Sequence, residues 1–353
     1  MKHKTFAITT FIFMIAFVGG FVFLTYYVDP FFHYHAPTDG LEYPLWTERY
    51  QNDGIARHFE YDTIVTGTSM TENFDTDKFD ELFGTKSVKL PLSGASYREI
   101  NDQLVRAYTY NDNITTVFRC LDLSDMASDK DSLNYDEYPD YLYDNDIFND
   151  VSYVLNKEIF YDYTTYVFQF MSEGGKTTPM KTYKVWSYTK TAKELVENYE
   201  KKTCESITTG LSEEEVDLLY GNLYQNVIAT VEAHPETHFI FYFPPYSILW
   251  WYDQVGSGNY AKAVETQKRA IDLLLEYDNV ELYSFFDDYV FVGTLGYYVD
   301  SVHYNYEYSN QILDKIAAGT GRITKENEET YLESLTFYNI FDYDSFLNQI
   351  LAN

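Results

Sequence analysis

The sequence predicts an α/β protein built on a central parallel sheet, with one long apolar helix at its N-terminus. Short β-type runs alternate with helical patterns, and most of the runs are too apolar for a sheet with one face in water. The five runs are Asp62–Gly67, Ser87–Leu92, Thr115–Leu123, His238–Pro245 and Asn279–Phe286. This alternation indicates a parallel sheet, whose functional sites form where the strands end.

The segments between these runs carry helix signals. They are Thr76–Gly84, closed by its glycine; Ser96–Tyr110; Ser212–His234, opened by a capping box of Ser212 and Glu215; and Ser257–Tyr277. We expect a flavodoxin-like three-layer sandwich over residues 61–353. The interval from about 124 to 210 breaks the alternation, and its Tyr/Asp-rich sequence predicts an insertion after the third strand.

The N-terminus predicts a membrane anchor. An uncharged run from Thr5 to Val28 follows Lys2 and Lys4, and it has about the ~20 residues that a helix needs to cross a bilayer. A cleaved signal peptide has a shorter apolar region, so we expect residues 1–28 to stay as cytoplasmic tip and anchor. Residues 29–60 would form a juxtamembrane segment. Because the basic residues precede the span, the bulk of the chain is expected outside the cytoplasm.

Composition excludes some classes of function. The chain has 25 basic and 55 acidic residues, a formal charge of -30, and this negative field repels nucleic acid. Two cysteines, Cys120 and Cys204, are too few for a disulfide framework. No Cys/His spacing indicates zinc, so neither a metal nor a cofactor is expected.

Two separated motifs carry the candidate chemistry. Ser69 follows the first strand in "TGTSMTEN", where it is either a nucleophile or the cap of the next helix. Asp300 and His303 follow the last strand in "DSVH", either as base and orienting carboxylate or as a helix-capping pair. Because both motifs follow parallel strands, we expect them to meet at one edge of the sheet.

Together with Gly94 in "LSGAS", these motifs resemble those of the SGNH/GDSL hydrolases, in the same order along the chain. The resemblance implies that Ser69 is the nucleophile, His303 the general base and Asp300 its orienting carboxylate. It also implies that the backbone N–H groups of Ser69 and Gly94 stabilise an oxyanion.

The sequence departs from this family at two points. GTS replaces GDS, and Asp122 in "CLDLSD" lies in or near the position of the family's asparagine donor. An ionised carboxylate would repel an oxyanion, so Asp122 is protonated, turned away or used otherwise. Asn73 is a second candidate for the oxyanion hole; the alternative is a solvent-exposed helix residue.

The anchor points to the membrane-anchored branch that includes teichoic-acid D-alanyl transfer proteins and polysaccharide O-acetyltransferase domains. That resemblance implies a serine acyltransferase with a cell-envelope glycan, an acyl donor and sometimes a multispanning acyltransferase as partners. An esterase or deacetylase with the same triad and a silent glycan-binding domain are the alternatives. Trp250 and Trp251 are candidates for a sugar platform or a membrane contact, with core packing as the other interpretation.

Overall fold

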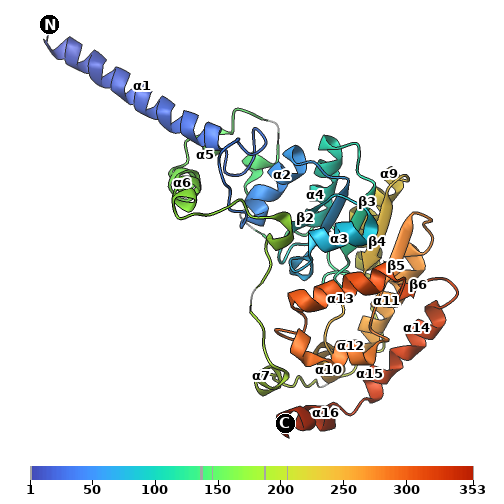
Figure 1. Ribbon diagram of the computed structural model, residues 1–353. Coiled ribbons are helices and arrows are strands. Elements are labelled where there is room, and N and C mark those ends of the chain that lie inside the picture. Colours follow the sequence, from blue (N-terminus) through green and yellow to red (C-terminus); the bar gives the residue numbers. More distant parts are fainter. Residues whose placement is uncertain (1, 136–137, 145, 187, 205, 353) are drawn as a thin grey trace. The chain divides into compact units, whose positions relative to one another are not determined.

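The computed structural model describes residues 2–135, 138–144, 146–186, 188–204 and 206–352 (Figure 1). The chain divides into two compact units. The first, which we call the anchor unit, is Met1–Phe59 with Glu137–Pro179; the second, the sheet unit, is Glu60–Asp136 with Met180–Asn353. The interval expected as one insertion therefore contributes its residues 137–179 to the anchor unit and the remainder to the sheet unit.

The anchor unit begins with a long apolar helix. Within the described residues, His3–Val28 is the one segment long and apolar enough to cross a membrane, with a mean hydropathy of 2.4. The elements of this unit are α1 (Lys2–Val28), α2 (Glu48–His58), the 3-10 turn η2 (Asp140–Leu142), α5 (Val151–Val154), the π-helical turn η3 (Ile159–Thr164) and α6 (Thr165–Ser172).

The chain after α1 is folded around a buried carboxylate. Asp29 accepts hydrogen bonds from the backbone N–H groups of His33, Tyr34 and His35. The hydroxyl of Tyr153 donates to the same carboxylate over 2.7 Å. The juxtamembrane turn is therefore tied to the segment around α5, far along the sequence.

The sheet unit is an α/β structure with a mixed, mostly parallel sheet. The strands are β1 (Thr63–Gly67), β2 (Ser87–Pro91), β3 (Thr116–Cys120), β4 (His238–Tyr242), β5 (Val280–Tyr283) and β6 (Arg322–Ile323). Their order is β2-β1-β3-β4-β5-β6. The five parallel strands lie within the five predicted runs, whereas the sequence analysis missed β6, a two-residue edge strand antiparallel to β5. All residues of β1 and β2 are buried, so both faces of the sheet are covered there.

The helices of the sheet unit follow the predicted end signals. Gly84 closes α3 in a left-handed conformation, and Ser212 and Glu215 form the expected capping box. The helices are α3 (Thr76–Phe83), α4 (Tyr97–Tyr110), α7 (Ala192–Glu197), α8 (Glu213–Leu223), α9 (Ala229–Ala233), α10 (Ile248–Gly256), α11 (Tyr260–Leu274), α12 (Tyr289–Gly293), α13 (Tyr306–Ala317), α14 (Glu328–Ser334), α15 (Thr336–Ile340) and α16 (Tyr343–Ala352). The short turns are η1 (Ser69–Thr71), η4 (Met180–Thr182), η5 (Tyr224–Ile228) and η6 (Leu295–Tyr297).

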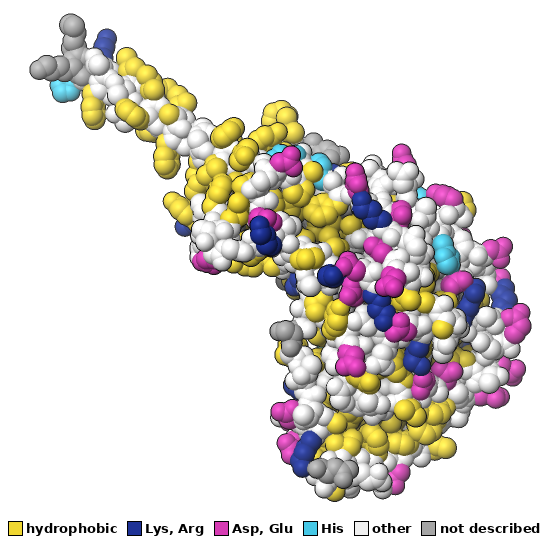
Figure 2. Space-filling model, in the orientation of Figure 1, with side chains coloured by type: hydrophobic (Ala, Val, Ile, Leu, Met, Phe, Trp, Pro, Cys, Tyr) yellow, Lys and Arg dark blue, Asp and Glu magenta, His cyan; other side chains and the backbone are white. Residues whose placement is uncertain are grey.

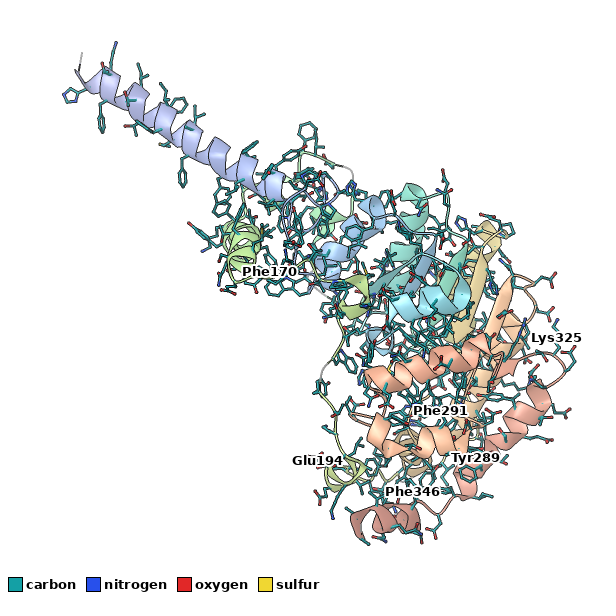
Figure 3. All side chains as sticks on the ribbon, viewed as in Figure 1. Phe170, Glu194, Tyr289, Phe291, Lys325 and Phe346 are labelled. Atoms are coloured by element: carbon teal, nitrogen blue, oxygen red, sulfur yellow. The ribbon has the colours of Figure 1, made fainter. Side chains whose placement is uncertain are left out.

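Aromatic packing supports the part of the sheet unit around α12 and α13. Figure 3 labels Tyr289 and Phe291, both of α12. Phe291 stacks on Tyr308 of α13 with ring centroids 4.0 Å apart, and Tyr289 stacks on Phe337. Tyr308 is fully buried, and its hydroxyl pairs with that of Tyr298 over 2.8 Å. Tyrosine thus contributes apolar area to this core together with a hydroxyl that is satisfied inside it.

Gly67, the last residue of β1, has a backbone that a larger residue would not tolerate. Its φ is +148°, and a Cβ would lie 2.6 Å from Cys120 Cβ. Gly67→Ala should lower the free energy of unfolding by about 2–4 kcal/mol, the sum of overpacking and backbone strain. Gly84→Ala is the matched control, because its φ is +70° with no atom within 4 Å. It should cost only about 1 kcal/mol. Urea unfolding in detergent measures both, and equal losses would contradict the predicted clash.

Candidate active site

Ser69 begins the turn η1 directly after β1. Its hydroxyl does not cap the following helix, because Asp75 caps α3 by accepting from the N–H groups of Asp77 and Lys78. Thr68 caps η1 itself. Gly67 brings the chain close to β3 and lets it turn sharply at this point. The capping alternative for Ser69 is therefore wrong, and the half-buried hydroxyl points elsewhere.

The hydroxyl of Ser69 meets His303, across 234 positions of sequence. Ser69 Oγ lies 2.8 Å from His303 Nε2, and His303 Nδ1 lies 2.7 Å from Asp300 Oδ2. The structure thus brings all three predicted residues into one hydrogen-bonded line. In this arrangement Asp300 fixes the tautomer in which Nδ1 carries the proton, which leaves Nε2 free to accept the serine proton.

Asp300 and His303 lie on a tight loop and not at a helix terminus. The loop is closed by an antiparallel bridge between Tyr298 and Tyr304. Asp300 Oδ1 accepts hydrogen bonds from the backbone N–H groups of Val302 and His303 over 2.8 and 2.7 Å. The carboxylate therefore shapes the loop with one oxygen and holds the imidazole with the other, which replaces the capping interpretation.

The surroundings of Asp300 and His303 shift the pKa values of both side chains. Burial opposes the ionisation of Asp300, but hydrogen bonds from His303 and from the loop backbone outweigh it, so the pKa of Asp300 is lowered. Burial alone would lower the pKa of His303. The hydrogen bond and charge of Asp300, together with the charges of Asp122 and Glu72, outweigh burial and raise the pKa of His303 above its usual value. A raised pKa makes the imidazole a stronger base.

Hydrogen bonds from the buried interior join the serine turn to the histidine loop. Asn73 Nδ2 donates to the carbonyl of Tyr304 over 2.8 Å. The Tyr304 hydroxyl donates to the carbonyl of Met70, beside Ser69, over 2.9 Å. Lys89 of β2 is also buried, and it donates to the carbonyls of Glu72 and Phe74. These bonds hold the chain that follows the serine turn. The spacing between Ser69 and His303 is therefore fixed by the neighbouring residues of both segments.

The two backbone donors expected for an oxyanion hole are free to act. Among the described residues, neither the N–H of Ser69 nor that of Gly94 has a hydrogen-bond acceptor. Gly94 is exposed, with φ +64°, and its carbonyl is held by the side chain of Asn134 over 3.0 Å. An oxyanion hole requires unpaired N–H groups, so both groups remain candidates for that role.

Asp122 does not supply a further donor. Its two carboxylate oxygens accept hydrogen bonds from the hydroxyls of Thr68, over 2.5 Å, and of Tyr246. Burial raises the pKa of Asp122 to about 6, although the bond from Thr68 opposes the shift. The side chain of Asp122 accepts hydrogen bonds from two hydroxyl groups. It is therefore not a donor to an oxyanion, and its candidacy as one is wrong.

Asn73 is likewise not an oxyanion donor, and the expectation that it is solvent-exposed is wrong. Its side chain is 1% exposed, and both ends of the amide are in use. Nδ2 binds the Tyr304 carbonyl, and Oδ1 accepts from the backbone N–H of Trp186 over 2.8 Å. Asn73 positions the segments around the triad.

Trp250 and Trp251 are buried in α10, with exposed fractions of 8% and 0%. Trp251 stacks on Tyr338 with centroids 4.2 Å apart, and Trp250 packs against Phe286. Both tryptophans are core residues, so the platform interpretation does not apply to them. The two cysteines are free thiols: Cys120 is buried and Cys204 is exposed.

A tryptophan that was not among the predicted site residues also lies at the site. The ring of Trp186 lies edge-on to His303, with centroids 5.0 Å apart, and its indole N–H donates to Glu72. Tyr188 stacks beside Trp186 at 6.0 Å and is 57% exposed. These aromatics lie in "KVWSYTK", a segment without helix or strand periodicity. Large aromatic residues in an irregular segment were the sequence signal that could have indicated a functional loop.

Comparisons with protein-family models, with curated proteins and with solved structures found no match to this chain. The chemistry of the site is therefore argued from its geometry.

The pKa shifts predict a pH dependence for acylation of Ser69. Only neutral His303 accepts the serine proton, so the rate of labelling by a fluorophosphonate should rise with pH through the raised pKa of His303. Asp300→Asn removes the main cause of the shift. It should move the midpoint to lower pH and slow labelling at least ~10²-fold, because the imidazole loses its orienting partner.

Asp122→Asn is the matched control for this measurement. It also removes a negative charge that acts on His303, but it leaves the hydrogen bond to Nδ1 intact. We expect a smaller downward shift of the midpoint and a labelling rate near that of wild type. An unchanged midpoint in Asp300→Asn would contradict the assigned pair.

Proposed function

We propose that the protein is a membrane-anchored serine acyltransferase that acts on a cell-envelope glycan or teichoic-acid-like polymer through an acyl-serine intermediate. One observation carries the proposal: the hydrogen-bonded line from Ser69 through His303 to Asp300, with distances of 2.8 and 2.7 Å. A structural serine does not require an imidazole and a carboxylate aligned behind it, whereas this pair activates a serine as a nucleophile.

In the first step, Ser69 Oγ attacks the carbonyl carbon of an acyl donor, and His303 Nε2 takes the hydroxyl proton. The carbonyl oxygen becomes an oxyanion that the N–H groups of Ser69 and Gly94 stabilise. As the intermediate collapses, the bond to the leaving group breaks and His303 returns the proton to that group. The product is an ester between the acyl group and Ser69.

In the second step, a hydroxyl of the acceptor loses its proton to His303 and attacks the acyl-serine carbonyl. The acyl-oxygen bond to Ser69 breaks, and the proton on His303 passes to Ser69 Oγ. The nucleophile is regenerated and the acceptor is esterified. With water in place of the acceptor, the same steps describe an esterase or deacetylase.

The fold supports membership in the SGNH/GDSL group and a flavodoxin-like arrangement. The first five strands have the order 2-1-3-4-5, with Ser69 after β1 and Gly94 after β2. The histidine loop follows β5, as the resemblance implies. These placements support the proposed site, whereas the fold alone does not define a function.

The aromatic pair at the site supports a sugar-containing acceptor. Trp186 contacts His303, and Tyr188 extends the aromatic surface into solvent. A sugar ring stacked there would hold its hydroxyl groups near the base.

One observation favours the esterase alternative. The side chains of Asp300 and His303 are 47% and 28% exposed, so water has access to the base. Transfer therefore depends on an acceptor that displaces this water. The silent glycan-binding alternative rested on Asp122, which lies outside the line of the triad.

The proposal places the sheet unit outside the cytoplasm. The apolar helix α1 would be the single span, with its basic tip inside, and a multispanning acyltransferase in the same membrane would be a suitable source of acyl groups. This topology rests on the charges that precede the span.

A covalent serine probe tests the nucleophile. A fluorophosphonate should label the wild-type protein, whereas Ser69→Ala should abolish labelling and His303→Ala should slow it by ~10² to 10⁴-fold, because the base is lost. Labelling is read by gel fluorescence and intact mass. Ser124→Ala removes an exposed serine outside the triad and should label like wild type. Labelling that persists in Ser69→Ala would exclude the mechanism.

A second variant separates the acceptor platform from the catalytic residues. Tyr188→Ala should retain fluorophosphonate labelling but acylate an envelope polymer about 3- to 10-fold more slowly at low polymer concentration, the equivalent of one aromatic contact. Tyr224→Ala, which removes another half-exposed tyrosine, is the control. The readout is acylated polymer against free acid, and equal rates in the two variants would argue against the platform.

A further inference from the structure

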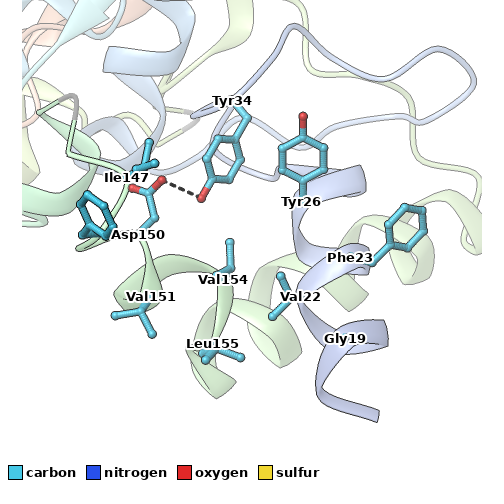
Figure 4. A pocket seen from close by; sticks show the side chains of 11 residues that line it. Gly19, Val22, Phe23, Tyr26, Tyr34, Ile147, Asp150, Val151, Val154 and Leu155 are labelled. Carbon is cyan, nitrogen blue, oxygen red and sulfur yellow. Dashed lines mark hydrogen bonds between the residues drawn. The ribbon is translucent and has the colours of Figure 1, made fainter. Parts of the chain in front are cut away.

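An apolar groove lies beside the C-terminal half of α1 in the anchor unit. It has a volume of about 660 Å³, within the range of ligand pockets. Gly19, Val22 and Phe23 of α1 form one wall, and Val151, Val154 and Leu155 form the other (Figure 4).

The rim of this groove exposes large apolar side chains. Ile147 and Phe148 are 73% and 85% exposed, and Val151 is 53% exposed. Figure 2 shows that hydrophobic side chains also run along the visible face of α1. Nearby, Phe160 stacks on Phe21 of α1 with centroids 4.0 Å apart. Contiguous exposed apolar surface of this kind marks a binding face.

The position of the groove along α1 indicates how deep in the membrane it lies. A helix rises ~1.5 Å per residue, so a hydrocarbon core of ~30 Å that begins at Thr5 ends near Leu24. Gly19, Val22 and Phe23 lie before this end, and the groove they line therefore lies within the outer leaflet. Tyr26 and Tyr27, both partly exposed, follow where interfacial aromatics are expected.

Polar groups close the groove at one end. The Tyr34 hydroxyl donates to Asp150 Oδ2 over 3.0 Å (Figure 4). His33 Nε2 lies 3.1 Å from Asp150 Oδ1. The carboxylate is thus satisfied inside the protein, and the remaining lining is apolar. Such a groove suits a hydrocarbon chain and offers little to a polar ligand.

We propose that this groove binds an acyl chain of an outer-leaflet lipid, so that residues 147–155 of the anchor unit dip into the membrane beside α1. The occupant follows from continuity with α1: the two walls lie at one depth, and lipid acyl chains are the molecules present there. The inference uses the membrane anchor but does not depend on the chemistry of Ser69.

Photo-crosslinking in vesicles tests the groove. The full-length protein is reconstituted in phosphatidylcholine that contains a lipid with a diazirine in its acyl chain, and the crosslinked peptides are mapped by mass spectrometry. Both α1 and residues 147–155 should be labelled in the wild-type protein.

Two glycines of α1 provide a matched pair of variants. A Cβ at Gly19 or at Gly20 meets no atom of the described residues within 4 Å, so both positions accept a larger residue. Of the two, Gly19 lines the groove and Gly20 does not. Gly19→Leu should reduce labelling of residues 147–155 severalfold, whereas Gly20→Leu should leave it unchanged. Labelling of α1 should persist in both variants.

Three outcomes would overturn the proposal. Labelling of α1 without labelling of residues 147–155 would place the groove in water. Absence of label on α1 would show that α1 does not lie within the bilayer, on which the inference depends. Equal labelling of residues 147–155 in Gly19→Leu and Gly20→Leu would show that the lipid contact lies outside the groove. Fluorophosphonate labelling of Ser69 is measured separately, so failure here is distinct from failure of the proposed acyl transfer.

Discussion

The arrangement of the site depends on the side-chain amide of Asn73. Its Nδ2 holds the carbonyl of Tyr304, next to His303, and its Oδ1 holds the backbone of Trp186. Asn73 itself lies one turn after Ser69, so one buried amide joins the three segments that meet at the triad. An amide is suited to this role because it donates and accepts at once, whereas a carboxylate only accepts when ionised. Loss of either bond would leave a buried polar group unpaired, which costs ~1–3 kcal/mol.

Buried tyrosines also join segments of the core by hydrogen bonds to backbone carbonyls. The hydroxyls of Tyr242 and Tyr304 both reach the carbonyl of Met70, and Tyr298 donates to the carbonyl of Pro245. Each ring fills apolar volume, while the hydroxyls satisfy the buried carbonyls of Met70 and Pro245. The histidine loop is therefore fixed by specific bonds as well as by packing. The high tyrosine content, at 37 residues, serves this core at least in part.

The sequence predicted those features that depend on local pattern or on chemical necessity. The five parallel strands follow from their apolar runs. The grouping of Ser69, Asp300 and His303 was predicted because a nucleophilic serine needs a base and a carboxylate that orients it. Three other features depend on distant contacts. Asn73 is buried by segments far along the chain, Trp186 reaches His303 from an irregular segment, and β6 has only two residues to carry a periodic signal. The division of the interval 124–210 between two units is likewise fixed by tertiary contacts, which no periodicity records.

Asp122 shows how a residue type that looks unfavourable in sequence is accommodated. A carboxylate beside an oxyanion would raise the barrier, but the hydroxyls of Thr68 and Tyr246 engage both of its oxygens. Its charge also acts on His303, whose pKa it helps to raise, so in the proposed mechanism it stabilises the imidazolium that forms when Ser69 loses its proton. In the proposed mechanism the cost falls on the oxyanion, which would rely on the N–H groups of Ser69 and Gly94 without a side-chain donor. One missing donor is worth about 3 kcal/mol in acyl-transfer enzymes. The proposed enzyme therefore gains basicity at His303 while giving up part of its oxyanion stabilisation.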